Sequence, residues 1–529
     1  MSAAQDAPVL DGTSRRPAGP RSRHHTAGSF PSALGWTVLG AVLPGVGFLA
    51  AGRRRLGALT LAFFLALVAA GLWFARGHLQ ALIRTAADKQ SLLWVVGGIA
   101  LVALIWIVVI VAGYRMLVPA RTSGGRHLVG GALVLVLVLA VAAPAVAAGR
   151  IVLVSRQLIA QVFHDGQSAT VVDKPNPFGD KKRVNVLLLG GDGGAGRQGV
   201  RTDTVIVASI DTHTGDTTLL SLPRNLENLP FPPDSPLAKV YPHGFKAGSE
   251  DESLLNAVYR NGPAQHPGIL GPTDDPGADF LKLGVGEALG LKIDYFVLVN
   301  LDGFSKLVDA LGGITVNVNY WVPVGGEPTT GALPDDYIKP GPNQHMDGPT
   351  ALAFARGRFG LTDYDRMARQ RCSIKAIVDA ADPVTLLRRY EDIAATTENI
   401  VSTDIPSSAL NDFVDLAFLV KDAPIRSLVF DTHVINPAYP DYAKIRRLTQ
   451  QALAPPPSAS SSSSSAPADG GTTSSASAPP TTPPTSAEAS GAAASPSGNP
   501  VAELGDACAY DPKQAAAQLA KGKPPTKHG

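Results

Sequence analysis

Acidic and basic side chains gather at the ends of three consecutive apolar segments between residues 185 and 228. Asp192 follows the first segment in a Gly-rich turn, Arg201 and Asp203 precede the second, and Arg224 follows the third. Carboxylate oxygens are hard ligands suited to a divalent cation, and guanidinium groups bind phosphate oxygens bidentately. These residue types at the ends of adjacent strands predict phosphoryl-transfer chemistry. Nitrogen and sulfur donors are missing from these motifs, which disfavours zinc.

The elements that must position these groups alternate between strand and helix. Strands are expected at 184–189, 205–210, 217–222, 295–300 and 314–318. Helices are expected at 254–261, 280–289, 301–311, 349–356 and 364–380. This mixture predicts an α/β fold, with three α/β/α layers around a mixed central sheet. The Gly-rich turn is not a nucleotide-binding P-loop, because no Gly-Lys-Ser or Gly-Lys-Thr follows it.

An apolar region precedes this domain and predicts a membrane anchor. Its apolar runs cover about 33–51, 56–75, 92–118 and 128–148. Each of the last three is long enough to cross about 30 Å of hydrocarbon. The first contains Pro44-Gly45 in its middle, which favours a re-entrant or interfacial segment. Loops rich in arginine, around Arg54 and Arg121, are expected on the cytoplasmic side. Three spans place the remainder of the chain outside the cell and four place it inside; we favour three.

Composition sets the remaining boundaries. A net charge of +2 without a dense basic stripe argues against a nucleic-acid partner. The segment 451–500 is nearly all Pro, Ser, Ala, Thr and Gly, and such a linker cannot bury enough apolar surface to fold. The sequence predicts a disordered cytoplasmic tail (1–32), a membrane region of three or four helices (33–150) and a connector (151–180). A catalytic domain (181–450), the linker (451–500) and a short C-terminal tail (501–529) follow.

The chain contains only two cysteines, Cys372 and Cys508. Two cysteines exclude a Cys-rich zinc or iron–sulfur framework. If both lie outside the cell, a disulfide that pins the tail to the domain is plausible. The alternative is two free thiols, one of them buried.

Five sequence blocks, in order, resemble those of the LytR-CpsA-Psr family. They read NVLLLGGD, RTDTVIVASID, LLSLPRN, FVLVNLDGFSKLVDALGGITVNV and ALAFARGRFGLTDYDRMARQ, over about 184–380. The form GGDGGAGRQGVRTD looks like the actinobacterial branch. Members of the family transfer polymers carried on polyprenyl pyrophosphate to peptidoglycan or another cell-envelope acceptor. The resemblance therefore implies a hydrophobic cleft for lipid, a Mg²⁺–pyrophosphate site at its mouth, and a multi-pass membrane protein with its catalytic domain outside.

The resemblance also assigns residues. Asp192 and Asp203 match the acids that hold the metal. The expected catalytic residues are Arg224, Arg356 and Arg358, together with Asp363, which is a candidate base and not part of the resemblance. The expected substrate-binding residues are Arg197, Arg201, Arg366, Arg369 and Gln370. Many members have an arginine shortly after the first Asp, whereas here Gly193-Gly194 follow Asp192 and the nearest arginine is Arg197.

The hypothesised reaction is attack by an acceptor sugar hydroxyl on the sugar-proximal phosphorus. Asp363 and Asp365 are the candidates for a base that receives the hydroxyl proton. Simpler interpretations stand beside these: a helix-capping or turn acid, an arginine that braces loops, a solvated basic face. The same site with water as acceptor would be a polyprenyl-pyrophosphate phosphatase. A non-catalytic lipid-binding or regulatory envelope protein is the rival from another class.

Overall fold

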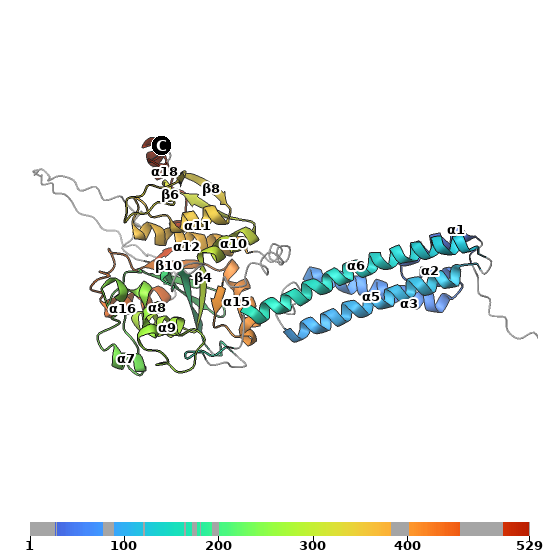
Figure 1. The fold of residues 1–529 in the computed structure, drawn as a ribbon, viewed down its shortest axis with the longest axis horizontal. Coiled ribbons are helices and arrows are strands. Elements are labelled where there is room, and N and C mark those ends of the chain that lie inside the picture. The colour runs from blue at the N-terminus through green and yellow to red at the C-terminus, as the bar shows by residue number, and fades with distance from the viewer. Residues whose placement is uncertain are drawn as a thin grey trace, which may run out of the picture. The chain divides into compact units, whose positions relative to one another are not determined.

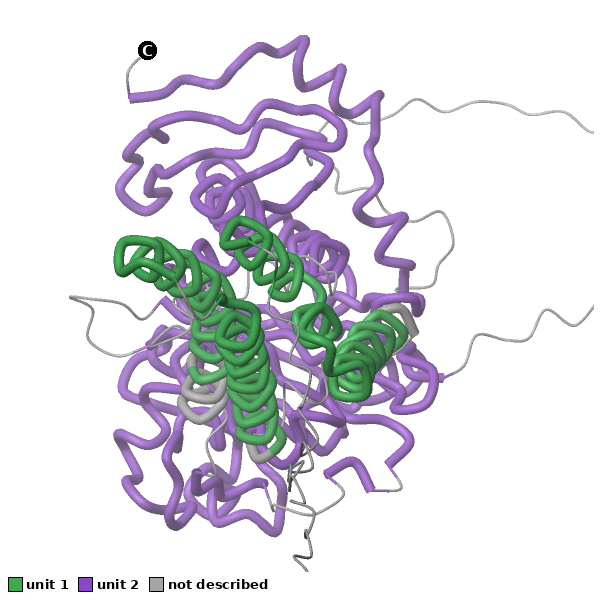
Figure 2. The backbone as a smooth tube through the Cα atoms, turned by 90° about the vertical axis from the view of Figure 1, so that its right-hand side faces the viewer, with its two compact units in different colours: residues 1–86, 90–153 green, residues 87–89, 154–529 purple. Residues whose placement is uncertain are grey.

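The computed structural model describes residues 27, 29–77, 89–119, 122–162, 166–171, 177–179, 181–192, 200–381, 401–454 and 501–527 (Figure 1). Arg197, the first 26 residues and the stretch 455–500 lie outside the described residues. The chain divides into two compact units, residues 1–86 with 90–153, and residues 87–89 with 154–529 (Figure 2).

The first unit is helical. It contains α1 (Phe30–Val42), α2 (Val46–Ala50), α3 (Arg54–Gly77), α5 (Lys89–Leu117) and α6 (Gly124–Val162). Three helical segments are long and apolar enough to cross a membrane: Arg54–Trp73, Ser91–Leu117 and Gly124–Leu153. The first apolar run is broken between α1 and α2, where Gly45 has a φ of 106°. A Cβ there would lie 2.5 Å from the carbonyl oxygen of Gly57, so only glycine fits the break.

The second unit is built on a seven-stranded mixed sheet. Its strands are β1 (Arg183–Gly191), β2 (Thr202–Asp211), β3 (Thr217–Leu222), β4 (Tyr295–Asn300), β9 (Val401–Thr403), β10 (Ile425–Val429) and β11 (Val501–Glu503). The strand order is β11-β10-β3-β2-β1-β4-β9. The pairs β1–β4 and β3–β10 are parallel and the other four are antiparallel. This confirms the predicted α/β class and mixed central sheet.

Both faces of the central strands are buried, so these strands read as continuous apolar runs. On one face, Leu187, Val207 and Leu220 belong to the core that includes residues of α8 (Leu255–Gln265), α9 (Pro276–Leu289) and α16 (Tyr442–Leu453). On the other face, Leu188, Ile206 and Leu219 share a cluster with Ile374 and Leu504. Each such leucine contributes roughly 1.5–3 kcal/mol when fully buried.

Three helices and two small sheets lie on this second face of the domain (Figure 1). The helices are α10 (Leu301–Leu311), α11 (Gly348–Arg356) and α12 (Asp363–Ala380). The small sheets pair β5 (Ile314–Val318) with β8 (Gly341–Met346) and β6 (Val322–Val324) with β7 (Asp336–Ile338). Asp347 caps α11, and a capping box of Thr362 and Asp365 begins α12. These caps fix where each helix starts and therefore where its charged residues lie. The unit also contains α7 (Pro236–Val240) and α15 (Leu410–Asp422).

The C-terminal segment returns to the domain. It contains β11, α17 (Leu504–Ala507) and α18 (Pro512–Ala520). β11 pairs antiparallel with β10 at the edge of the main sheet, and Leu504 is fully buried. A disulfide joins Cys508 to Cys372 of α12, which realises one of the two alternatives left open by the sequence. The short tail is thus part of the packed unit.

Candidate functional site

A cavity of about 210 Å³ opens between the main sheet and helices α10, α11 and α12. Its walls are mainly apolar, and they include Leu188, Val297, Phe304, Leu307, Leu352, Ile374 and Ile377. Five of the predicted site residues also line it: Asp192, Asp203, Arg356, Arg366 and Gln370. The structure therefore brings together both predicted metal ligands, two of the predicted arginines and an apolar recess.

Asp192 and Asp203 reach this cavity from the ends of neighbouring antiparallel strands. The β1–β2 register shifts at Gly190/Gly191, which brings Gly191 opposite Thr202. The backbone N–H of Asp192 donates to the carbonyl of Arg201 at 3.1 Å, and the N–H of Arg201 donates to Asp192 Oδ1 at 2.8 Å. A Cβ at Gly191 would lie 2.7 Å from Val200 Cγ1, so a larger residue here would displace the side chain of Val200.

Asp203 is the centre of a network of four charged groups. Arg224 Nη1 donates to Asp203 Oδ1 at 2.9 Å, and Arg224 Nε lies 3.4 Å from Asp363 Oδ1. Arg366 Nη2 donates to Asp363 Oδ2 at 3.2 Å and to the carbonyl of Asp203 at 3.0 Å. Burial raises the pKa of Asp203, but the guanidinium groups of Arg224 and Arg366 outweigh burial and hold that pKa below its usual value. The carboxylate therefore stays ionised and available to a cation.

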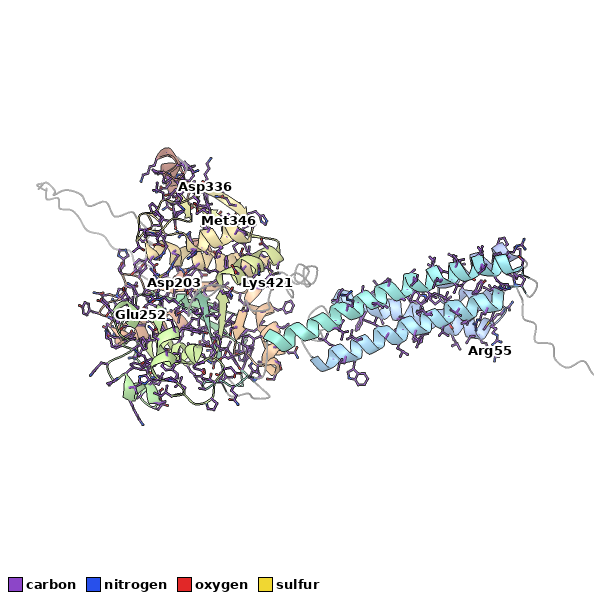
Figure 3. The ribbon with its side chains drawn as sticks, in the orientation of Figure 1. Arg55, Asp203, Glu252, Asp336, Met346 and Lys421 are labelled. Carbon is purple, nitrogen blue, oxygen red and sulfur yellow. A yellow bond between two sulfur atoms is a disulfide. The ribbon has the colours of Figure 1, made fainter. Side chains whose placement is uncertain are left out.

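Arg201 points to a second network next to the first. Its Nη2 donates to Glu252 Oε1, and Arg260 Nη2 donates to Glu252 Oε2. Asn261 Nδ2 also donates to Glu252 Oε2, at 2.6 Å. The hydrogen bonds from Asn261 and Arg260 lower the pKa of Glu252 to about 2. Glu252 thereby fixes the guanidinium of Arg201. Figure 3 labels Glu252 and Asp203.

The second predicted arginine group divides into two kinds of environment. Arg356, the last residue of α11, is exposed and lines the cavity, and Arg358 is half-buried two residues later. Arg369 is buried and donates from Nε to the carbonyl of Phe354 at 2.6 Å and from Nη1 to the hydroxyl of Tyr320 at 2.9 Å. These bonds describe a structural brace, while its role in substrate binding stays a prediction from the resemblance.

The carboxylates of both candidate bases contact other groups of the protein. Asp365 Oδ2 accepts from the backbone N–H of Thr362 at 2.9 Å and from its hydroxyl at 2.6 Å, which closes the capping box. Asp363 is ion-paired with Arg224 and Arg366. The role of either residue as a base stays a prediction from the sequence.

The donor set fits a hard divalent cation whose remaining ligands come from outside the protein. Among the described residues, no group of three or more His, Cys, Asp or Glu side chains is placed to hold a metal. Asp192 and Asp203 alone line the cavity as acids, which suits Mg²⁺ because this ion usually keeps several waters and binds through one or two carboxylates plus phosphates. The buried Nε of Arg366 has no hydrogen-bond partner in the described structure, as expected for a group that awaits an anionic ligand.

Another cavity, of about 350 Å³, lies elsewhere in the domain and holds none of the predicted residues. Its buried acid Asp279 accepts from Ser168, Ala169, Thr170 and Thr273. These bonds attach the connector to the N-terminal end of α9. Because its central carboxylate is already satisfied, this cavity is not a candidate site.

Two residues of the site's surroundings were not predicted. Glu252 lies in the short 3-10 helix Asp251–Ser253 and Asn256 at the start of the amphipathic helix α8, and neither forms a recognisable spacing with the charged blocks. Asn256 Nδ2 donates to Asp203 Oδ1 at 3.2 Å, and this contact depends on the packing of α8 against β2.

Comparison with known proteins gives one family and a set of relatives. The family model of the LytR_cpsA_psr family matches residues 159–436. Biofilm regulatory protein A of Streptococcus mutans is 27% identical over 238 residues, covering 44% of this chain and 52% of that protein. Polyisoprenyl-teichoic acid–peptidoglycan teichoic acid transferase TagU of Enterococcus faecalis is 30% identical over 232 residues, covering 43% of this chain and 63% of that protein.

The chain therefore spans about half to two thirds of the length of these curated relatives. Among solved structures, the crystal structure of B. subtilis TagV is similar at 24% identity and a TM-score of 0.35, covering 51% of this chain and 97% of that chain. A TM-score this low supports no conclusion by itself. The family match rests on the sequence.

Proposed function

The chain belongs to the LytR_cpsA_psr family, and from this premise we propose that it transfers a glycopolymer from a polyprenyl-pyrophosphate carrier to peptidoglycan. The product is a phosphodiester link in the cell wall. The observation that carries the proposal is the cavity itself, in which apolar walls meet two acids and two arginines at one opening. An apolar recess suits a prenyl chain, and the charged opening suits its pyrophosphate.

The charged residues have distinct roles in this proposal. Arg224, Arg356, Arg358 and Arg366 bind the pyrophosphate and stabilise negative charge on the leaving lipid phosphate. Asp363 holds Arg224 and Arg366 in place. Arg201, fixed by Glu252, and Gln370, from the cavity wall, bind further oxygens of the headgroup.

Mg²⁺ held by Asp192 and Asp203 would neutralise charge on the pyrophosphate when bound. The acceptor hydroxyl attacks the sugar-proximal phosphorus, the bond from that phosphorus to the bridging oxygen breaks, the hydroxyl proton passes to solvent, and the lipid phosphate leaves. Phosphoryl transfer of this kind depends on positioning and charge more than on a strong base, in agreement with the paired states of Asp363 and Asp365.

The placement of the domain follows from the anchor. We propose three membrane spans, with the catalytic domain outside the cell as a three-layer α/β/α sandwich. Arg53 precedes α3, and Arg54 and Arg55 are its first two residues. Arg115 lies in the last turn of α5, and Arg126 lies in the first turn of α6. With three spans these arginines lie together on the cytoplasmic side. The prenyl carrier would then reach the cavity from the outer leaflet.

The test uses the full chain in detergent, a polyprenyl-pyrophosphate-linked oligosaccharide, a peptidoglycan acceptor and Mg²⁺. We expect a phosphodiester-linked conjugate that disappears with Asp203→Ala and with EDTA. Free phosphate or sugar phosphate without a conjugate would identify a phosphatase, and tight lipid binding without turnover would identify a binding protein. Either of these results would refute the transferase.

A further inference from the structure

Asn256 touches both halves of the charged network although it has no charge itself. It lies at the second position of α8 and is only 4% exposed. Its side-chain Nδ2 donates to Asp203 Oδ1 at 3.2 Å, and its backbone N–H donates to the carbonyl of Arg224 at 3.0 Å. One residue thus connects the acid that begins β2 with the arginine that follows β3.

These contacts distinguish the two oxygens of Asp203. Oδ1 accepts from both Arg224 Nη1 and Asn256 Nδ2. Among the described residues, Oδ2 is ion-paired only with Arg366 Nη1, at the longer distance of 4.0 Å. Two donors on one oxygen fix the rotation of the carboxylate group, and in that rotation the second oxygen keeps its capacity to accept a ligand.

The side-chain amide of Asn256 lowers the stability of the fold. Its Oδ1 is buried and has no hydrogen-bond partner in the described structure. An unpaired buried acceptor destabilises a fold, whereas an apolar side chain of the same shape carries no such penalty. The presence of a residue that lowers the stability of the fold at this position indicates that the residue serves the function of the site.

We propose that Asn256 is a positioning residue, which orients the carboxylate of Asp203 so that Oδ2 faces the pyrophosphate headgroup and its divalent cation. This rests on the proposed function for the nature of the ligand. Asn256 makes no contact with the substrate in this assignment. It acts through Asp203, as the groups that hold metal-binding side chains generally do.

The test measures binding and stability separately on the full chain in detergent. Asn256→Leu removes the amide while it keeps the size of the side chain, and Asn256→Asp keeps the shape while it removes the Nδ2–H donor. Asn185→Leu is the matched control, because Asn185 is also a buried asparagine with an unpartnered Oδ1, at the opposite end of β1. Farnesyl pyrophosphate with Mg²⁺ and Mn²⁺ alone are the probes, and thermal unfolding gives Tm.

We expect both Asn256 variants to weaken binding of farnesyl pyrophosphate with Mg²⁺, and of Mn²⁺, by about 10-fold or more. Asn256→Leu should keep or raise Tm, and Asn185→Leu should bind both probes like the wild type. Wild-type binding by Asn256→Leu or Asn256→Asp would overturn the assignment. If binding depends on Asn256 while no conjugate forms, the transferase fails and the positioning role stands. A wild-type protein that binds neither probe would overturn both.

Discussion

Arg369 holds the backbone on both sides of Arg356. Its Nε donates to the carbonyl of Phe354 at 2.6 Å, and its Nη2 donates to the carbonyl of Gly357. The two arginines therefore have different environments. Arg369 is buried and braces the end of α11, whereas Arg356 is exposed and lines the cavity. A count of arginines in the sequence block does not separate these roles.

Substitution of these two arginines should separate activity from stability. Arg356→Ala should lower transfer by about 10²–10³-fold, the effect of removing one preorganised charge-stabilising group, with little change in Tm.

Arg369→Ala leaves the carbonyls of Phe354 and Gly357 without their donor, at a cost of roughly 1–3 kcal/mol each. Arg369→Lys should also destabilise, because one ammonium cannot reproduce the planar fork. Thermal unfolding and initial rates measure both effects; a normal rate with Arg356→Ala would remove that residue from the site.

Local sequence signals predicted the central part of the domain well. Strands β1 to β5 and helices α8 to α12 lie where periodicity placed them, because their burial pattern is written in consecutive residues. Pro44-Gly45 likewise marked the break before α2. The charged blocks contributed five of the residues that line the cavity, because β1, β2, α11 and α12 meet there; the other described members of the predicted set do not line it.

Long-range pairing was not predictable in the same way. β11 has three residues and joins β10 from beyond a long Pro- and Ser-rich stretch, so nothing local marks it as a strand. The contact of Asn256 with Asp203 joins residues 53 positions apart. Such contacts depend on how α8 packs on β2, which periodicity does not specify.

The pKa of Glu252 predicts an acid-dependent contribution to stability. Its folded pKa of about 2 lies below its usual value of 4.5, so its stabilising effect is complete above pH 4.5 and disappears as the pH falls towards 2. The free energy of unfolding of Glu252→Gln should therefore differ from wild type most near pH 6 and converge with it below pH 3. Because the side chain is about a third exposed, the difference should be small and should shrink in high salt.

Urea unfolding of both proteins between about pH 2 and pH 6 measures this difference. Asp336→Asn serves for comparison, since Asp336 also has a lowered pKa but its ion pair joins β7 to Lys523 of the C-terminal segment and lacks contact with Arg201. Asp336 and Glu252 are labelled far apart within the same domain in Figure 3. A difference for Glu252→Gln that does not vary with pH would show that packing, and not charge, holds Arg201.

The disulfide should keep the C-terminal segment docked. Cys372 and Cys508 are 136 residues apart, and closing a loop of that length removes about 5 kcal/mol of unfolded-state entropy in the chain-entropy model. Cys508→Ser, or reduction with dithiothreitol, should increase amide hydrogen exchange in 501–527 first, because β11 contributes only a short pairing with β10. The double variant with Cys372→Ser should match the single one. Unchanged exchange would show that packing of Leu504 alone is sufficient.

The buried pair of Lys282 and Asp404 predicts a large loss of stability when one partner is removed. Lys282 Nζ is ion-paired with Asp404 Oδ2 and donates to the carbonyl of Asp294 at 3.0 Å, with its side chain 1% exposed. Burial raises the pKa of Asp404, although the ion pair with Lys282 partly counters this. Lys282→Met would leave that carboxylate buried without its cation, which typically costs about 3–5 kcal/mol.

Asp404→Asn in the Lys282→Met background removes the uncompensated charge and should restore part of this loss, because a neutral amide is less costly to bury. Neither residue lines the cavity that contains Asp203, so transfer per folded molecule should stay at the wild-type level. Urea unfolding of the wild type, both single variants and the double variant gives the coupling energy directly. Additive losses in this cycle would contradict the pairing, since two residues that stabilise each other must show a smaller loss together than the sum of their separate losses.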